Sequence, residues 1–113
     1  LIVASACSEG FGSHEFRASQ SRLVELGHDA FLQTLLAKRF ADVDEWQTEM
    51  QLKPMRAGRV QLYTTGLDDA DRRLTGVENV ASVEAALAAA LARAGNAAVA
   101  VIPEGPYVVP VVA

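Results

Sequence analysis

The chain has 113 residues, a formal net charge of -4 and a pI near 5.0; half of its residues are hydrophobic and 6% are aromatic. This length fits one domain with a core of Val, Leu, Ile and Ala. The acidic balance and scattered basic residues argue against a nucleic-acid binder. No apolar run approaches the roughly 20 residues that cross a bilayer, which argues against membrane insertion. The single Cys7 excludes an internal disulfide and fits a reducing, cytoplasmic compartment.

The first third of the chain predicts a strand followed by two helices. Residues 1–7 are apolar without alternation, which predicts a strand buried on both faces. Ser13 is the expected N-cap of a helix that ends at Gly27. Asp29 can cap a second helix, which carries apolar side chains at helical spacing as far as Phe40.

The middle of the chain predicts a helix, a strand and a short helix. Asp42 or Asp44 can cap the helix, and Pro54 is expected to end it. Residues 59–65 alternate in polarity and include β-branched side chains, so they predict a second strand. Residues 68–73 begin with a capping aspartate and predict a short helical turn.

The last third predicts a well-defined helix and a third strand. Val80 is either the end of a brief strand or a single core residue. Ser82 is the expected N-cap of a helix that ends at Gly95. Residues 97–102 then predict a strand, and residues 107–113 predict an edge or extended segment because a proline lies within them.

Strands that alternate with helices indicate parallel pairing through right-handed crossovers. The expected fold is therefore a three-layer α/β domain of Rossmann-like type with a small, mainly parallel sheet, formed as one domain by residues 1–113. Ligands bind beyond the carboxyl ends of such strands. The turns expected there are residues 8–12, 64–66 and 104–105, all polar and glycine-containing, although connections of this kind are often only structural.

The chemistry-bearing residues form no convincing catalytic group. Gly10 and Gly12 resemble half of a dinucleotide fingerprint, but the third glycine position is Glu15, and acidic residues disfavour a pyrophosphate. His14 and His28 lack metal-ligand spacing, so no metal site is expected.

Two further residues leave alternatives open. Cys7 follows the first strand, where a nucleophile could lie, yet a packed thiol is favoured because His14 is the only nearby base. Trp46, the only tryptophan, lies in a polar segment and fits either the core or the wall of a pocket.

Three segments together carry a resemblance to a known family. They are residues 6–12 (Ala-Cys-Ser-Glu-Gly-Phe-Gly) with Phe16 downstream, residues 44–47 (Asp-Glu-Trp-Gln) and residues 101–106 (Val-Ile-Pro-Glu-Gly-Pro). In this order and spacing they resemble the C-terminal domain of the nickel-pincer-dependent lactate racemase family of 2-hydroxyacid racemases and epimerases. The resemblance extends over essentially all 113 residues.

The resemblance implies a two-domain isomerase. In that family a nickel-pincer nucleotide, tethered to a lysine, accepts a hydride from the substrate and returns it to either face, while two histidines move the hydroxyl proton. These groups belong to the family's N-terminal domain, so the resemblance implies no catalytic residue, metal ligand or bound cofactor in this chain. We expect a fragment, inactive alone, that begins abruptly within a strand and has that N-terminal domain as its partner.

The same resemblance implies the substrate-pocket residues. Trp46 is similar to the family's pocket tryptophan, which the C-terminal domain contributes across the cleft to a small 2-hydroxy acid. Ser8, Glu9 and Gly10 are expected near that cleft because they follow the first strand. Two alternatives remain without catalysis: a module that binds a small molecule at residues 8–12, and a structural domain that covers a partner.

Overall fold

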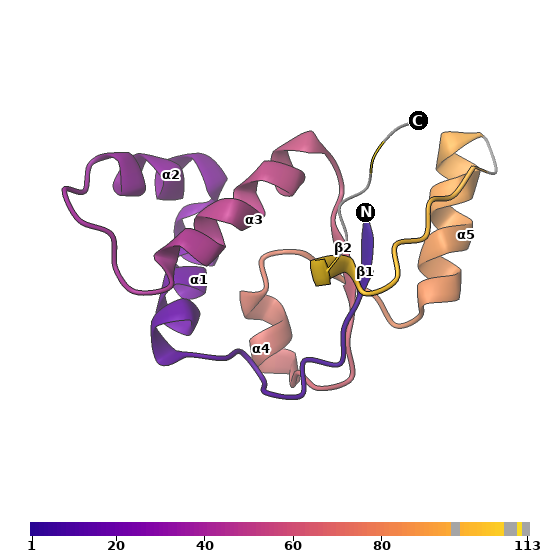
Figure 1. The fold of residues 1–113 in the computed structure, drawn as a ribbon, viewed down its shortest axis with the longest axis horizontal. Coiled ribbons are helices and arrows are strands. Elements are labelled where there is room, and N and C mark those ends of the chain that lie inside the picture. Colours follow the sequence, from indigo (N-terminus) through magenta and orange to yellow (C-terminus); the bar gives the residue numbers. More distant parts are fainter. Residues whose placement is uncertain (96–97, 108–110, 112–113) are drawn as a thin grey trace.

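The protein is described by a computed structural model that covers residues 1–95, 98–107 and 111. Within those residues it contains a small parallel sheet and five α-helices, which confirms the α/β class (Figure 1). The elements follow the order β1 (Ile2–Ala4), α1 (His14–Leu26), α2 (His28–Leu36), α3 (Glu45–Ala57), β2 (Gln61–Tyr63), α4 (Asp69–Leu74), β3 (Glu78–Asn79), α5 (Val83–Ala94) and the 3-10 turn η1 (Gly105–Tyr107).

The three strands lie side by side in the order β1-β2-β3, and both pairs are parallel. Ile2 pairs with Gln61, and Leu62 pairs with Asn79. Three helices connect β1 to β2, and α4 connects β2 to β3, as parallel pairing requires. Figure 1 shows the strands between α5 on one side and the α1–α3 group on the other, and α5 packs against β1.

The main apolar cluster lies between the helices and not over the sheet. Leu23 of α1, Phe31 of α2 and Leu52 of α3 are each at most 3% exposed, and Leu32 and Leu35 pack against them. Helix α1 therefore packs its apolar face against both α2 and α3. Helices α1, α2 and α3 form one helical unit beside a thin sheet.

Several helix boundaries follow the predicted caps. The hydroxyl of Ser13 accepts a hydrogen bond from the amide of Phe16 at 3.0 Å, and that of Ser82 accepts one from Ala85. The Asp68 carboxylate caps α4 in the same way. Gly95 ends α5 with a φ of 68°, a left-handed conformation that suits glycine.

The boundaries of α2 were predicted wrongly. Its N-cap position is Gly27, without a side-chain cap, so Asp29 lies in the first turn of the helix. The helix ends at Leu36, and Phe40 lies outside it with 78% of its surface exposed. Ala37 is the C-cap, and Lys38, the next residue, forms ion pairs with Asp42 and Glu45 near the start of α3.

The start of α3 was predicted correctly, but its end was not. Asp44 occupies the N-cap position with a left-handed φ of 60°, without a capping side-chain bond. The helix continues through Pro54 to Ala57. Pro54 lies in the last turn, where its missing amide removes only one hydrogen bond of the helix. Gly58, whose amide donates to the Pro54 carbonyl at 3.0 Å, ends it.

Two predicted strands also need correction. β1 is shorter than residues 1–7 and is not buried on both faces, since Val3 is 37% exposed on this edge strand. Residues 98–102 form no strand, and Ala97 lies outside the described residues. The third strand is instead β3, directly before Val80, whose amide donates to the carbonyl of Leu62 at 2.9 Å. Of the tail, residues 108–110 and 112–113 lie outside the described residues.

The turns after β1 and β2 touch each other at Gly66. A Cβ atom added to Gly66 would lie 2.5 Å from the carbonyl oxygen of Cys7 and even closer to that of Ala6. The hydroxyl of Thr64 also donates to the Ala6 carbonyl at 3.3 Å. Only glycine fits this close approach, so the carboxyl ends of the first two strands are held at one edge of the sheet.

We predict that Gly66→Ala lowers the free energy of unfolding by about 1–3 kcal/mol, because the new methyl group forces two backbone segments apart. Gly58→Ala is the matched control: its φ of 171° is extended backbone and no atom lies within 4 Å of the added Cβ. The control should change stability by less than about 1 kcal/mol. Urea denaturation measures both; equal effects of the two substitutions would contradict the close approach.

Candidate functional site

The turn after β1 and the start of α3 enclose a hollow of about 480 Å³ at the carboxyl edge of the sheet. We call it the turn hollow. Ser8, Glu9 and Gly10 line it, as do Asp44 and Gln47 of α3. Two of the three segments that carry the family resemblance therefore lie against the same space, although more than thirty residues of chain separate them.

Hydrogen bonds through Asp44 fix the geometry of the turn hollow. Its Oδ2 accepts a 2.5 Å hydrogen bond from the hydroxyl of Ser13, which at the same time caps α1. Its Oδ1 accepts a 3.0 Å bond from the side-chain amide of Gln47. Asp44 thus ties the first turn of α3 to the N-terminus of α1, and its carboxylate faces donors from two elements. This role replaces the helix-capping bond that the sequence suggested.

An inner, mostly apolar hollow of about 250 Å³ adjoins the turn hollow and shares Cys7, Gly10, Phe11 and Phe16 with it. The rings of Phe11 and Phe16 stack with centroids 5.5 Å apart. The carboxyl edge of the sheet therefore offers two adjoining hollows, one of mixed polarity and one mostly apolar, and small-molecule sites commonly combine such surfaces.

Two glutamines form the polar part of the inner hollow. The amide nitrogen of Gln20 donates to the side-chain oxygen of Gln51 at 2.6 Å, and the amide nitrogen of Gln51 donates to the carbonyl of Thr75 at 2.6 Å. Because the Thr75 carbonyl can only accept, the side-chain amide of Gln51 must turn its nitrogen towards Thr75 and its oxygen towards Gln20. That oxygen in turn requires the amide nitrogen of Gln20 to face it. This chain of bonds links α1, α3 and the turn before β3.

Trp46 lines a different hollow from Ser8, Glu9 and Gly10. It is 61% exposed and borders about 200 Å³ of space between the end of α2 and the start of α3, together with Leu35. Its place is therefore a surface and not the core. The remaining residues of that hollow are Lys38, Arg39, Ala41, Glu45 and Glu49.

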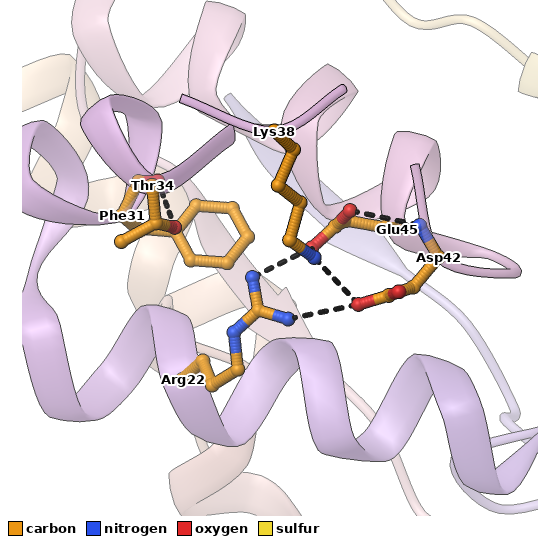
Figure 2. Close-up of polar contacts among 6 residues, drawn as sticks. All are labelled: Arg22, Phe31, Thr34, Lys38, Asp42 and Glu45. Atoms are coloured by element: carbon orange, nitrogen blue, oxygen red, sulfur yellow. Dashed lines mark hydrogen bonds and ion pairs between the residues drawn. The ribbon is translucent and has the colours of Figure 1, made fainter. Parts of the chain in front are cut away.

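Next to Trp46, the carboxylate of Glu45 is buried in a cluster of charges (Figure 2). Its Oε1 accepts from Arg22 at 2.6 Å and from Lys38 at 2.7 Å. Its Oε2 accepts from the backbone amide of Asp42 at 3.1 Å. The cluster therefore joins α1, the α2–α3 loop and α3 at the residue that precedes Trp46.

The cations of this cluster are also shared and packed. The side chain of Asp42 accepts from Lys38 at 2.5 Å, and the Arg22 guanidinium lies 5.3 Å from the centroid of the Phe31 ring. Figure 2 shows Arg22 reaching from its helix towards both Phe31 and the carboxylates. Each charge has at least two partners, as a buried ion cluster needs if it is to offset the cost of removing water.

The pKa values of the cluster follow from these contacts. Burial by itself raises the pKa of the buried carboxyl, whereas hydrogen bonds from Lys38, the Asp42 amide and Arg22 lower it. The net pKa of Glu45 lies below its usual value near 4.5. Hydrogen bonds to Asp42 and Glu45 raise the pKa of Lys38 above its usual value of 10.5.

The other candidate residues are dispersed. The thiol of Cys7 is half-buried and donates to the Ser5 hydroxyl at 3.5 Å, and no hydrogen bond among the described residues joins it to a base. His14 begins α1 and His28 begins α2. Among the described residues, no three His, Cys, Asp or Glu side chains gather in a way that could hold a metal ion.

Sequence reasoning missed Asp44 and Gln47 as neighbours of the first turn. The sequence feature that could have indicated them is the Asp-Glu-Trp-Gln segment, in which only the tryptophan was predicted to line a pocket. It also missed the Arg22–Lys38–Asp42–Glu45 cluster, whose members come from three separate segments and show no periodic pattern.

No family model, curated protein or solved structure matches the chain. In the part of the chain that the structure describes, every helix is too short or too polar to cross a bilayer.

We predict that Glu45→Gln lowers the free energy of unfolding by about 2–4 kcal/mol, because Arg22 and Lys38 lose the buried anion that they share. Glu49→Gln, on the exposed face of α3 and without an ion pair among the described residues, is the control and should change stability by less than about 0.5 kcal/mol. Urea denaturation at pH 7 compares the two. Equal effects would contradict a special role for the buried carboxylate.

The same cluster predicts a pH dependence. Because the pKa of Glu45 is lower in the folded than in the unfolded state, its ionised form stabilises the fold above pH 4.5. That stabilisation should be lost progressively as the pH falls below 4.5, through the folded pKa. The difference in urea midpoint between the wild type and Glu45→Gln should therefore shrink below pH 4.5; a constant difference would contradict the assignment.

Proposed function

We propose that this chain is the C-terminal domain of a nickel-pincer-dependent racemase or epimerase of 2-hydroxy acids, and that it closes the substrate cleft of an N-terminal catalytic domain. The observation that carries the proposal is the turn hollow. Residues 8–10 and residues 44–47, which both belong to segments with the family resemblance, adjoin the same edge of the molecule. A shared site gives a reason for these distant segments to occur together.

In this proposal Trp46 and the turn hollow form two adjacent parts of one cleft wall. Trp46 and Gln47 are consecutive in the first turn of α3, so their side chains leave the helix about 100° apart. Gln47 points to the turn hollow, and Trp46 presents an exposed indole to the neighbouring surface. An exposed tryptophan is suited to contact a substrate or a second domain.

The residues of this chain do not fit the nickel-pincer nucleotide, since the described residues offer no metal-binding group. We therefore assign the cofactor to the N-terminal domain. The turn hollow carries the carboxylates of Glu9 and Asp44 and no cationic side chain. The counter-ion for the carboxylate of a 2-hydroxy acid would then also come from the N-terminal domain, and this chain would orient and cover the substrate.

The proposed fold is a three-layer Rossmann-like domain. Its support is the position of α5, which follows β3 and packs against β1 on the side away from α1–α3 (Figure 1).

A second candidate function is a module that binds a small molecule without catalysis. The combination of a hollow of mixed polarity with an adjoining apolar hollow favours it, because such a site accepts an amphiphilic molecule without a second domain. A thermal-shift screen separates the two functions. The isolated chain should be stabilised by its ligand in the second case and by no 2-hydroxy acid in the first, since half of the cleft is absent.

We predict that the complete reading frame around this chain, expressed with the cofactor-making enzymes, interconverts the enantiomers of a 2-hydroxy acid, and that the isolated chain does not. Lactate, malate and sugar acids form the substrate panel, and chiral chromatography measures the products. Turnover by the isolated chain, or none by the complete protein on any of these acids, would contradict the proposal.

In that complete protein, Trp46→Ala should reduce kcat/KM by about tenfold or more, because the indole contacts substrate or closes the cleft. Phe40→Ala, which removes another exposed aromatic ring from the preceding loop, is the matched control and should leave kcat/KM within about twofold. Unchanged kinetics in the Trp46 variant would remove its proposed role.

A further inference from the structure

A separate hollow of about 540 Å³ lies between the end of α1, the start of α2, α4 and β3. None of the residues that line it lines the turn hollow. Its lining includes His28 and two adjacent arginines, Arg72 and Arg73, with one acidic residue, Asp69. The charge of these side chains is net positive in a chain whose overall charge is -4.

Arg72 is held rigidly and without a counter-ion. Its Nε donates to the carbonyl of Leu67 at 3.0 Å and its Nη2 donates to the carbonyl of Thr64 at 3.1 Å. Both partners are neutral, and among the described residues no carboxylate lies within ion-pair distance of this guanidinium. The two carbonyls fix the orientation of the guanidinium plane without neutralising its charge, and Arg72 is one of the residues that line the hollow.

Arg73 is the second uncompensated cation. It is exposed and makes no hydrogen bond or ion pair within the part of the chain that the structure describes. Asp69 lies one helical turn earlier on α4 but does not approach within ion-pair distance. Two arginines without a carboxylate partner among the described residues that line the same hollow suit an anion of charge -2.

Part of the lining of the hollow is apolar. Leu23, Val24 and Val77 contribute it, and Gly76 lies beside α1: a Cβ there would be in ordinary van der Waals contact, 3.6 Å from Leu23 and 3.8 Å from Val24. The volume suits a molecule larger than a bare ion, since sites for small ligands typically span about 300–1,000 Å³. The hollow thus combines a cationic side with an apolar side.

We propose that this hollow binds a small organic phosphate, with Arg72 and Arg73 holding the phosphate and the Leu23–Val24–Val77 wall contacting the organic group. The planar guanidinium of Arg72, already oriented by backbone carbonyls, loses little freedom when it donates its remaining N–H groups to phosphate oxygens. The site is independent of the cleft proposed above, so either proposal can fail without the other.

The test is an NMR titration of the full 113-residue chain with phenyl phosphate, inorganic phosphate and phenol. Phenyl phosphate should bind saturably and shift the backbone amides of His28 and Gly76, which lie at the hollow. Inorganic phosphate should bind at the same amides at least fivefold more weakly, and phenol should not bind at the same concentration. Equal binding of the two phosphates, or no saturable binding of either, would overturn the proposal.

Arg73→Gln should weaken phenyl phosphate binding about tenfold, the loss of one charge-assisted hydrogen bond. Arg93→Gln is the matched control: this arginine is exposed in the last turn of α5 and lines no part of the hollow, so its variant should bind as the wild type does. Because Arg73 has no partner among the described residues, its variant should keep the wild-type urea midpoint. Equal weakening in both variants would mean general attraction to positive charge and would refute the site.

Discussion

The carboxylate of Glu45 determines how the helical part of this protein is assembled. The apolar cluster of Leu23, Phe31 and Leu52 brings three helices together, but apolar contacts alone leave their ends free to shift. The buried carboxylate fixes one end of that contact, because cations from α1 and from the loop after α2 both need the same anion. The start of α3, and with it Trp46, is positioned by this requirement.

The start of α3 also connects the helical unit to the sheet. Asp44 accepts a hydrogen bond from Ser13 at the N-terminus of α1 and borders the turn hollow. The next residue, Glu45, is buried in the ion cluster. One turn of helix therefore presents three consecutive side chains to three environments: a hollow, the interior and the surface.

Local signals predicted what local interactions determine. The helix of α5 follows from Ser82 and Gly95, whose cap and left-handed turn act within four residues. Residues 98–102 have the composition of a strand, but a strand exists only through a partner, and composition does not say whether one is present. For the same reason the sequence indicated the turn at Ser8–Gly10 yet not its contact with Asp44, which depends on the packing of α1 against α3.

The parallel pairing of β1 with β2 has a consequence for the order of folding. Ile2 can pair with Gln61 only when the segment between them, which contains three helices, closes into a loop. Closing so long a loop costs conformational entropy of the chain. Contacts between α1 and its neighbours α2 and α3 shorten that loop in advance. The helical unit should therefore form before the sheet, and the turn hollow, which needs both, should be among the last parts to become ordered. A ligand or second domain that binds there would stabilise the region of the protein that becomes ordered last during folding. The same region is expected to open first when the native structure unfolds locally.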